Sequence, residues 1–191
     1  HDVTIPEPCI YFGREDLVYL IVHNHAGEMD YPGSDAFEGT NYQGSTGIAV
    51  NSLFRKLLFS IYFKDRNILF TSKTNDNSKI LFRRNIREAI SHITPFLKLD
   101  SDPYLVLTDE GLFWMQDAYT RSRWYPNAAP YDGTHNYIRS SVKIVVDAYN
   151  GTIAYYKADK DDPVVRAYER SYPGLIKPLD EMPDTLQSHI R

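Results

Sequence analysis

Hydrophobic positions recur along this chain with two different spacings, which predict a mixture of strands and helices. Short apolar runs predict strands at residues 17–22 and 68–71. Apolar residues at helical spacing predict helices at residues 53–63 and 86–94, and Pro95 ends the second because proline cannot continue a helix.

The first of these helices has an apolar stripe that is wider than usual. Asn51 or Ser52 is the expected N-cap, since short polar side chains bond the free N–H groups of a first turn. Phe59 and Phe63 extend the stripe over much of the circumference. We therefore expect this helix to be a mostly buried core element.

Two pairs of apolar runs are each joined by a turn-forming sequence and predict β-hairpins. The pairs are residues 104–108 with 112–115 and residues 142–146 with 152–156. The second turn contains Asn150–Gly151, which predicts a type I′ turn with positive φ at both positions. Strands joined by such short turns pair in antiparallel fashion.

The remaining elements complete an α+β fold, with a mostly antiparallel sheet built from β-hairpins and helices packed on one face. Asp162–Pro163 is a cap followed by proline at the first helical position, and Met182–Pro183 opens a last short helix. The length of 191 residues predicts a single soluble domain over residues 1–191, with its hairpin-rich core at about 99–172.

Composition and charge favour a sheet-containing protein and argue against some kinds of partner. Aromatic residues make up 14% of the chain, with 15 tyrosines, which favours a sheet. A net charge of -4 argues against a nucleic-acid partner, because phosphate binding needs a clustered basic surface. No apolar run approaches the roughly 20 residues that span a bilayer. Cys9 is the single cysteine and has no partner for an internal disulfide.

Several motifs, in order along nearly the whole chain, resemble Uncharacterised protein family 0182. They are Glu28–Pro32, Phe54–Phe59, Pro95–Tyr104, Trp124–Pro126, His135–Arg139, Val145–Thr152, Asp161–Pro163 and Glu181–Pro183 before His189–Arg191. The resemblance implies a large bacterial parent protein with several N-terminal transmembrane helices and a large region outside the cytoplasm. It implies no catalytic residues.

From the resemblance, we expect this chain to be a fragment of that extracytoplasmic region, located at the cell membrane of a bacterium. The expected function is noncatalytic binding or assembly, with the transmembrane part of the same chain and other envelope proteins as partners. The rival is a cell-envelope enzyme with a site near the Glu28–Asp30 loop and His135. An apolar pocket with converging polar groups at that loop would favour the enzyme.

Six residues are the candidates for binding, because arginine forks hold carboxylates in two-point contacts. They are Glu28, Asp30, Arg83, Arg84, His135 and Arg139. The expectation is that the arginines pair with the two acids and fix their loop. Substrate, partner identity and oligomeric state stay open.

Three short patterns have both a metal-binding and a structural interpretation. Asp100–Ser101–Asp102 has the carboxylate spacing of metal-dependent sugar transferases, but such residues also bond their own backbone in loops. His23 and His25 form the second pattern, which lacks a third ligand at a recognisable spacing. The third, Asp159–Asp162, lacks the glycine and distal glutamate of a calcium loop. We expect no metal and no cofactor.

Overall fold

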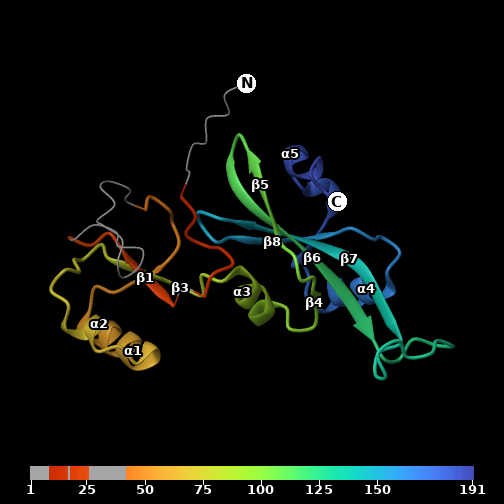
Figure 1. The fold of residues 1–191 in the computed structure, drawn as a ribbon, viewed down its shortest axis with the longest axis horizontal. Coiled ribbons are helices and arrows are strands. Elements are labelled where there is room, and N and C mark those ends of the chain that lie inside the picture. The colour runs from red at the N-terminus through yellow and green to blue at the C-terminus, as the bar shows by residue number, and fades with distance from the viewer. Residues whose placement is uncertain (1–8, 17, 26–41) are drawn as a thin grey trace. The chain divides into compact units, whose positions relative to one another are not determined.

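A computed structural model describes residues 9–16, 18–25 and 42–191 of the chain. The contacts concentrate in two compact units, one formed by His1–Gly13 with Ile86–Arg191 and the other by Arg14–Asn85. Each unit has a sheet of its own (Figure 1). The expectation of a single soluble domain over residues 1–191 stays a prediction.

The smaller unit is a three-stranded antiparallel sheet with two helices. Its elements are β1 (Tyr19–Val22), β2 (Ile48–Ala49), α1 (Leu53–Phe63), α2 (Asn67–Phe70) and β3 (Lys79–Phe82). The strand order is β1-β3-β2, so the last strand lies between the first two. Val50, Ile68 and Ile80 form a buried cluster, against which Phe59 and Phe63 of α1 pack.

Local signals set the ends of α1, as the sequence predicts. The Ser52 hydroxyl accepts a hydrogen bond from the N–H of Arg55 at 3.3 Å. Lys64 has a left-handed backbone (φ 54°) and closes the last turn by donating its N–H to the carbonyl of Ile61. The prediction of a strand at residues 68–71 is wrong, because Asn67–Phe70 forms the short helix α2.

The larger unit is a six-stranded sheet with four short helical segments. Its strands are β4 (Lys98–Leu99), β5 (Tyr104–Thr108), β6 (Gly111–Ser122), β7 (Tyr137–Asp147), β8 (Ile153–Lys157) and β9 (Ile176–Pro178). Its helical segments are α3 (Ile86–Ile93), α4 (Pro163–Ser171), the 3-10 turn η1 (Leu179–Glu181) and α5 (Asp184–Gln187).

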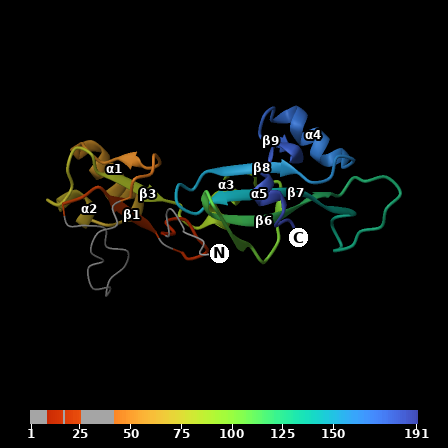
Figure 2. The ribbon, with the colours of Figure 1, turned by 90° about the horizontal axis from the view of Figure 1, so that it is seen from above.

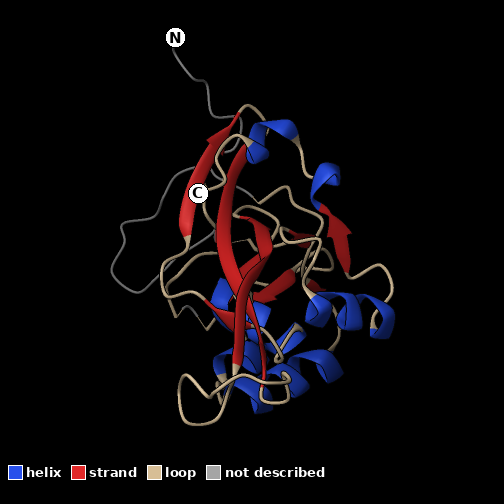
Figure 3. Ribbon diagram, turned by 90° about the vertical axis from the view of Figure 1, so that its right-hand side faces the viewer, coloured by secondary structure: helices blue, strands red, loops and turns tan. Residues whose placement is uncertain are grey.

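The strand pairing of the larger unit is antiparallel except at one edge. The order is β4-β6-β7-β8-β9, and β5 also pairs with β6. The long strands β6 and β7 run side by side for most of their length (Figures 1 and 3). The last strand, β9, lies beside β8 and is parallel to it (Figure 2). Both predicted hairpins are present, and the α+β class with a mostly antiparallel sheet is confirmed.

Both faces of this sheet are covered, and not one alone as the sequence suggested. Six consecutive residues of β7, from 141 to 146, are buried, although successive side chains of a strand point to opposite faces. On one face, Val145 and Met115 pack with Met182 and Leu186 from the η1–α5 segment. Opposite faces are therefore both shielded by helices or loops.

The turn between β7 and β8 differs from the predicted type I′ turn. Gly151 has a positive φ of 70°, whereas Asn150 does not. The Asp147 carboxylate accepts the N–H groups of Tyr149 and Asn150 and so organises a longer loop from 148 to 152. Asp147 therefore stabilises this loop through its side chain, as aspartates commonly do in turns, and in residues 148–152 only Gly151 has a left-handed backbone.

Candidate functional site

The residues selected from the sequence for binding fall in different parts of the chain. Glu28 and Asp30 lie outside the described residues, so their pairing with arginines stays a prediction. Arg83 and Arg84 follow β3 in the smaller unit, whereas His135 and Arg139 belong to the larger unit.

The two arginines after β3 have opposite environments. Arg83 is exposed and has a left-handed backbone (φ 53°). Arg84 is only 1% exposed and is among the largest fully buried side chains. A buried guanidinium needs internal partners. The predicted pairing of Arg84 with Glu28 or Asp30 stays a prediction, because both acids lie outside the described residues.

His135 closes a turn in the loop between β6 and β7. The Asp132 carboxylate accepts the N–H groups of His135 at 2.6 Å and Thr134 at 2.9 Å. Its second oxygen lies 2.9 Å from Nδ1 of the His135 ring. The backbone hydrogen bond from His135, then the ring contact, holds the pKa of Asp132 well below its usual range. Nδ1 of the imidazole is therefore already in contact with Asp132 of the same loop.

The same loop presents a tryptophan to solvent. The Asn136 amide accepts the N–H of Tyr125 at 3.0 Å and donates to its carbonyl at 2.7 Å. The Tyr125 ring stacks on Tyr137 of β7 with centroids 4.6 Å apart. Trp124, beside these anchored residues, is 86% exposed. The loop is thus ordered by its own contacts.

Arg139 pairs with Asp159, an acid that was not among its expected partners. The guanidinium Nε lies 2.5 Å from a carboxylate oxygen of Asp159. This contact joins β7 to the loop that precedes α4. The Asp159 carboxylate neutralises the charge of Arg139, so this arginine does not need a ligand as its counter-ion.

Asp162 is fully buried at the start of α4 and is surrounded by hydrogen-bond donors. The hydroxyls of Thr120 (2.5 Å), Tyr137 (2.9 Å) and Ser141 donate to its two oxygens, and so does the N–H of Val164 (2.8 Å). Burial by itself raises the pKa of Asp162, but these hydrogen bonds outweigh burial and lower that pKa below its ordinary value. Asp162 is therefore a charged anchor between the sheet and α4.

The other acids with a possible metal-binding role also have structural contacts. Asp100 accepts the hydroxyl of Tyr119 at 2.7 Å and the N–H of Asp102 at 3.1 Å. Asp159 accepts the N–H of Asp161 at 2.9 Å. Within residues 9–16, 18–25 and 42–191, no three His, Cys, Asp or Glu side chains are grouped so that they could hold a metal ion.

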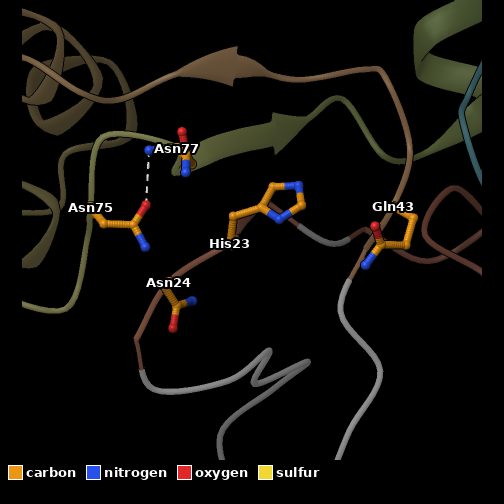
Figure 4. A pocket seen from close by; sticks show the side chains of 5 residues that line it. All are labelled: His23, Asn24, Gln43, Asn75 and Asn77. Atoms are coloured by element: carbon orange, nitrogen blue, oxygen red, sulfur yellow. Dashed lines mark hydrogen bonds between the residues drawn. The ribbon is translucent and has the colours of Figure 1, made fainter.

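A polar pocket of about 300 Å³ lies in the smaller unit (Figure 4). Its lining residues are His23, Asn24, Gln43, Asn75 and Asn77. The Asn75 side chain accepts the N–H of Asn77, and the Ser78 hydroxyl donates to the His23 carbonyl at 2.9 Å. Amides and one imidazole can bond a neutral polar molecule. The apolar pocket expected of an enzyme was predicted at the Glu28–Asp30 loop, which lies outside the described residues.

The apolar surface of α1 was predicted to be mostly buried, and this prediction is wrong. Six of its side chains are exposed, which contradicts the expectation of a buried helix. We call this surface the α1 apolar face; its residues are Leu53, Phe54, Leu57, Leu58, Ile61 and Tyr62. Leu53 is 75% exposed and Ile61 is 66% exposed. Such a contiguous exposed apolar surface is uncommon, whereas isolated exposed apolar residues are common.

The helix buries a different and narrower side. Phe59 and Phe63 face the core of the smaller unit, and Ser60 is the one buried residue of α1. At about 100° per residue, the six exposed positions cover roughly half of the circumference. The sequence carried this signal as an unusually wide stripe, which fits a helix with two partners as well as a buried one.

Comparison with known proteins assigns the chain to a family. The family model described as "Uncharacterised protein family (UPF0182)" matches residues 1–191. This chain belongs to that family. A UPF0182 protein of Nitrosococcus oceani is 52% identical over 201 residues, covering 98% of this chain and 23% of the relative. Those of Syntrophobacter fumaroxidans and Desulforamulus reducens are 48% and 45% identical, with 98% and 100% of this chain covered.

The chain spans between about a fifth and a quarter of these UPF0182 relatives, namely 23%, 22% and 21% of their lengths. No solved structure matches it. Among the described helices, none has the length and apolar character needed to cross a membrane.

Proposed function

We propose that this chain is a noncatalytic binding or assembly domain of a larger membrane protein, and that the α1 apolar face is its contact surface. The observation that carries the proposal is the exposure of six apolar side chains on one ordered helix. Leaving that much apolar surface in water is unfavourable, and burial against a partner removes the cost.

The size of the relatives supports other parts of the same protein as neighbours of this domain. UPF0182 relatives are four to five times longer than this chain, so most of each relative lies outside the matched region. The transmembrane part of the parent protein and other envelope proteins are the proposed neighbours. We place the domain on the extracytoplasmic side of a bacterial cell membrane.

An assembly role predicts that the α1 apolar face matters only in the full-length protein. Leu58→Glu in full-length protein should lower the amount that accumulates in the membrane, because the charge blocks burial of the face. The same substitution in the 191-residue chain should leave the free energy of unfolding nearly unchanged, since the side chain is already exposed.

Trp124→Ser is the matched control, since it removes an exposed apolar side chain from the other unit. It should not change accumulation of the full-length protein. If Leu58→Glu accumulates like the wild type, the α1 apolar face is not an assembly surface.

The proposed location has a separate test. Ser101 is exposed, and Ser101→Cys in a Cys9→Ser background gives one labelling site on this chain. A membrane-impermeant maleimide should label full-length protein in intact cells that lack an outer-membrane barrier. Labelling only after the cells are permeabilised would place the domain in the cytoplasm.

A further inference from the structure

We infer that the α1 apolar face binds the interfacial region of an anionic lipid bilayer. The inference rests on the proposed function, because it names the partner of the same contact surface. It depends on which charged residues surround the face, on the length of the helix and on how the helix is held.

Basic residues lie at one border and at the end of the apolar face. At about 100° per residue, Arg55 follows Tyr62 around the helix. Lys64 is exposed just after the helix. Residues 51–64 contain no acid. An apolar face bordered by lysine and arginine is the pattern of helices that lie in the interface of anionic membranes.

The length of α1 fits binding parallel to the membrane surface. Eleven residues extend over about 16 Å at 1.5 Å per residue, which is about half the thickness of the hydrocarbon core. Phe54 and Tyr62 add aromatic rings to the face, and tyrosine is favoured where one end of a side chain is apolar and the other wet. The face can enter the headgroup region without crossing the bilayer.

The helix is already ordered before it meets a partner. The Ser52 cap fixes its first turn, and the Phe63 ring packs against Tyr19 with centroids 4.8 Å apart. The Tyr19 hydroxyl donates to Asp65 at 2.5 Å, next to the end of the helix. Asp65 is the one acid in residues 51–66, and it is engaged in this contact. Binding therefore requires little ordering of the chain, which favours affinity.

Charge argues against a second copy of this chain as the partner. Two copies that paired through their α1 apolar faces would bring Arg55 and Lys64 of each near those of the other. No acid in residues 51–64 could pair with them. Like charges at an interface oppose association, whereas anionic headgroups complement both residues.

The test is sedimentation of the 191-residue chain with vesicles. We expect binding to vesicles of equal parts phosphatidylcholine and phosphatidylglycerol. Binding to pure phosphatidylcholine should be on the order of tenfold weaker, and salt should weaken binding to the mixed vesicles because it screens charge. Equal binding to both vesicle types, or no binding to either, would overturn the inference.

Variants distinguish vesicle binding through the α1 apolar face from nonspecific binding. Leu58→Glu and Ile61→Glu should each weaken binding to the mixed vesicles on the order of tenfold or more, because each variant loses an apolar side chain that the bilayer would bury. Arg55→Glu should weaken binding to the mixed vesicles and not to phosphatidylcholine. Trp124→Ser should bind like the wild type, and loss of binding in this variant instead would overturn the inference.

Two outcomes distinguish failure of this inference from failure of the proposed function. If vesicles do not bind but Leu58→Glu lowers accumulation of the full-length protein, the contact surface stands and its partner is a protein. If the chain forms dimers that Leu58→Glu abolishes, the partner is a second copy and lipid binding is wrong. If neither accumulation nor vesicle binding responds to Leu58→Glu, both proposals fall.

Discussion

Gly151 lies so close to the ring of Phe12 that no other residue fits without movement. A Cβ built on Gly151 would be 2.6 Å from Cε1 of Phe12. The ring has little room to move, because Phe12 is buried and donates its N–H to the carbonyl of Ala148, while its own carbonyl accepts from the Trp114 indole. The N-terminal segment thus packs directly on the β7–β8 turn.

We predict that Gly151→Ala lowers the free energy of unfolding by about 2 kcal/mol or more. A left-handed backbone costs a non-glycine residue roughly 1–2 kcal/mol, and the contact with Phe12 adds to that cost. Gly133→Ala is the control, because Gly133 also has a positive φ (79°) but has open space around its Cβ position. Urea unfolding should show the smaller loss for Gly133→Ala, and equal losses would contradict the packing on Phe12.

The hydrogen bonds to Asp162 predict a stability that depends on pH. Because its pKa is lowered in the folded protein, ionised Asp162 contributes stability above the pKa of about 3.9 that an aspartate has in the unfolded chain. That contribution is lost as the pH falls below 4 and through the folded-state pKa. Asp162→Asn should therefore be less stable than wild type at pH 7, and the difference should shrink toward pH 3.

Asp161→Asn is the control for this pH dependence. Asp161 is the neighbouring acid but is exposed, and its side chain makes none of the four contacts that Asp162 makes. Urea titrations between pH 3 and pH 7 should give this variant the same slope of stability against pH as the wild type. An unchanged slope in Asp162→Asn would contradict the assignment of Asp162 as a charged anchor.

Two isoleucines of the smaller unit, one buried and one exposed, allow the same substitution to be compared in both environments. Ile68 is 2% exposed and belongs to the buried cluster, whereas Ile61 lies on the α1 apolar face. Ile68→Ala should cost about 2–5 kcal/mol, and Ile61→Ala should change the free energy of unfolding by about 0.5 kcal/mol or less. Similar large losses for both would show that α1 is buried, as the sequence pattern suggested.

The buried Lys143 gives a prediction about an asymmetric ion pair. Its ammonium lies 2.7 and 2.8 Å from the two carboxylate oxygens of Asp117. Lys143 is buried and Asp117 is partly exposed. Asp117→Asn should therefore cost about 3–5 kcal/mol by removing the carboxylate from a buried charge and leaving it the Arg191 carbonyl at 3.1 Å, whereas Lys143→Met should cost less. Thermal unfolding of the two variants that gave the opposite order would contradict this account.

Local signals predicted most of the elements, because they act within a few residues. Ser52 and Asp162 are observed as helix caps, and Pro95 follows the end of α3, since capping and proline chemistry need no distant partner. Residues 68–71 show where this fails. A short apolar run fits a strand or a buried helix equally well, and the contact of Ile68 with the core decides it.

The candidate site was less predictable for a related reason. Periodicity shows which residues of α1 share a side, but not which side meets the rest of the chain. Phe59 and Phe63 are partly buried against the core while Leu57 and Ile61 are exposed, and nothing in their residue types separates the two pairs. Arg84 is the converse case, a charged residue whose burial the sequence pattern did not indicate.

The central claim is that the α1 apolar face is exposed in this chain and covered in the full-length protein. The most direct test is the rate at which a maleimide labels Leu58→Cys in a Cys9→Ser background, relative to the unfolded protein. We predict fast labelling of the 191-residue chain and labelling on the order of tenfold slower in full-length protein in its membrane, because burial excludes the reagent. Equal rates in the two forms would contradict the claim.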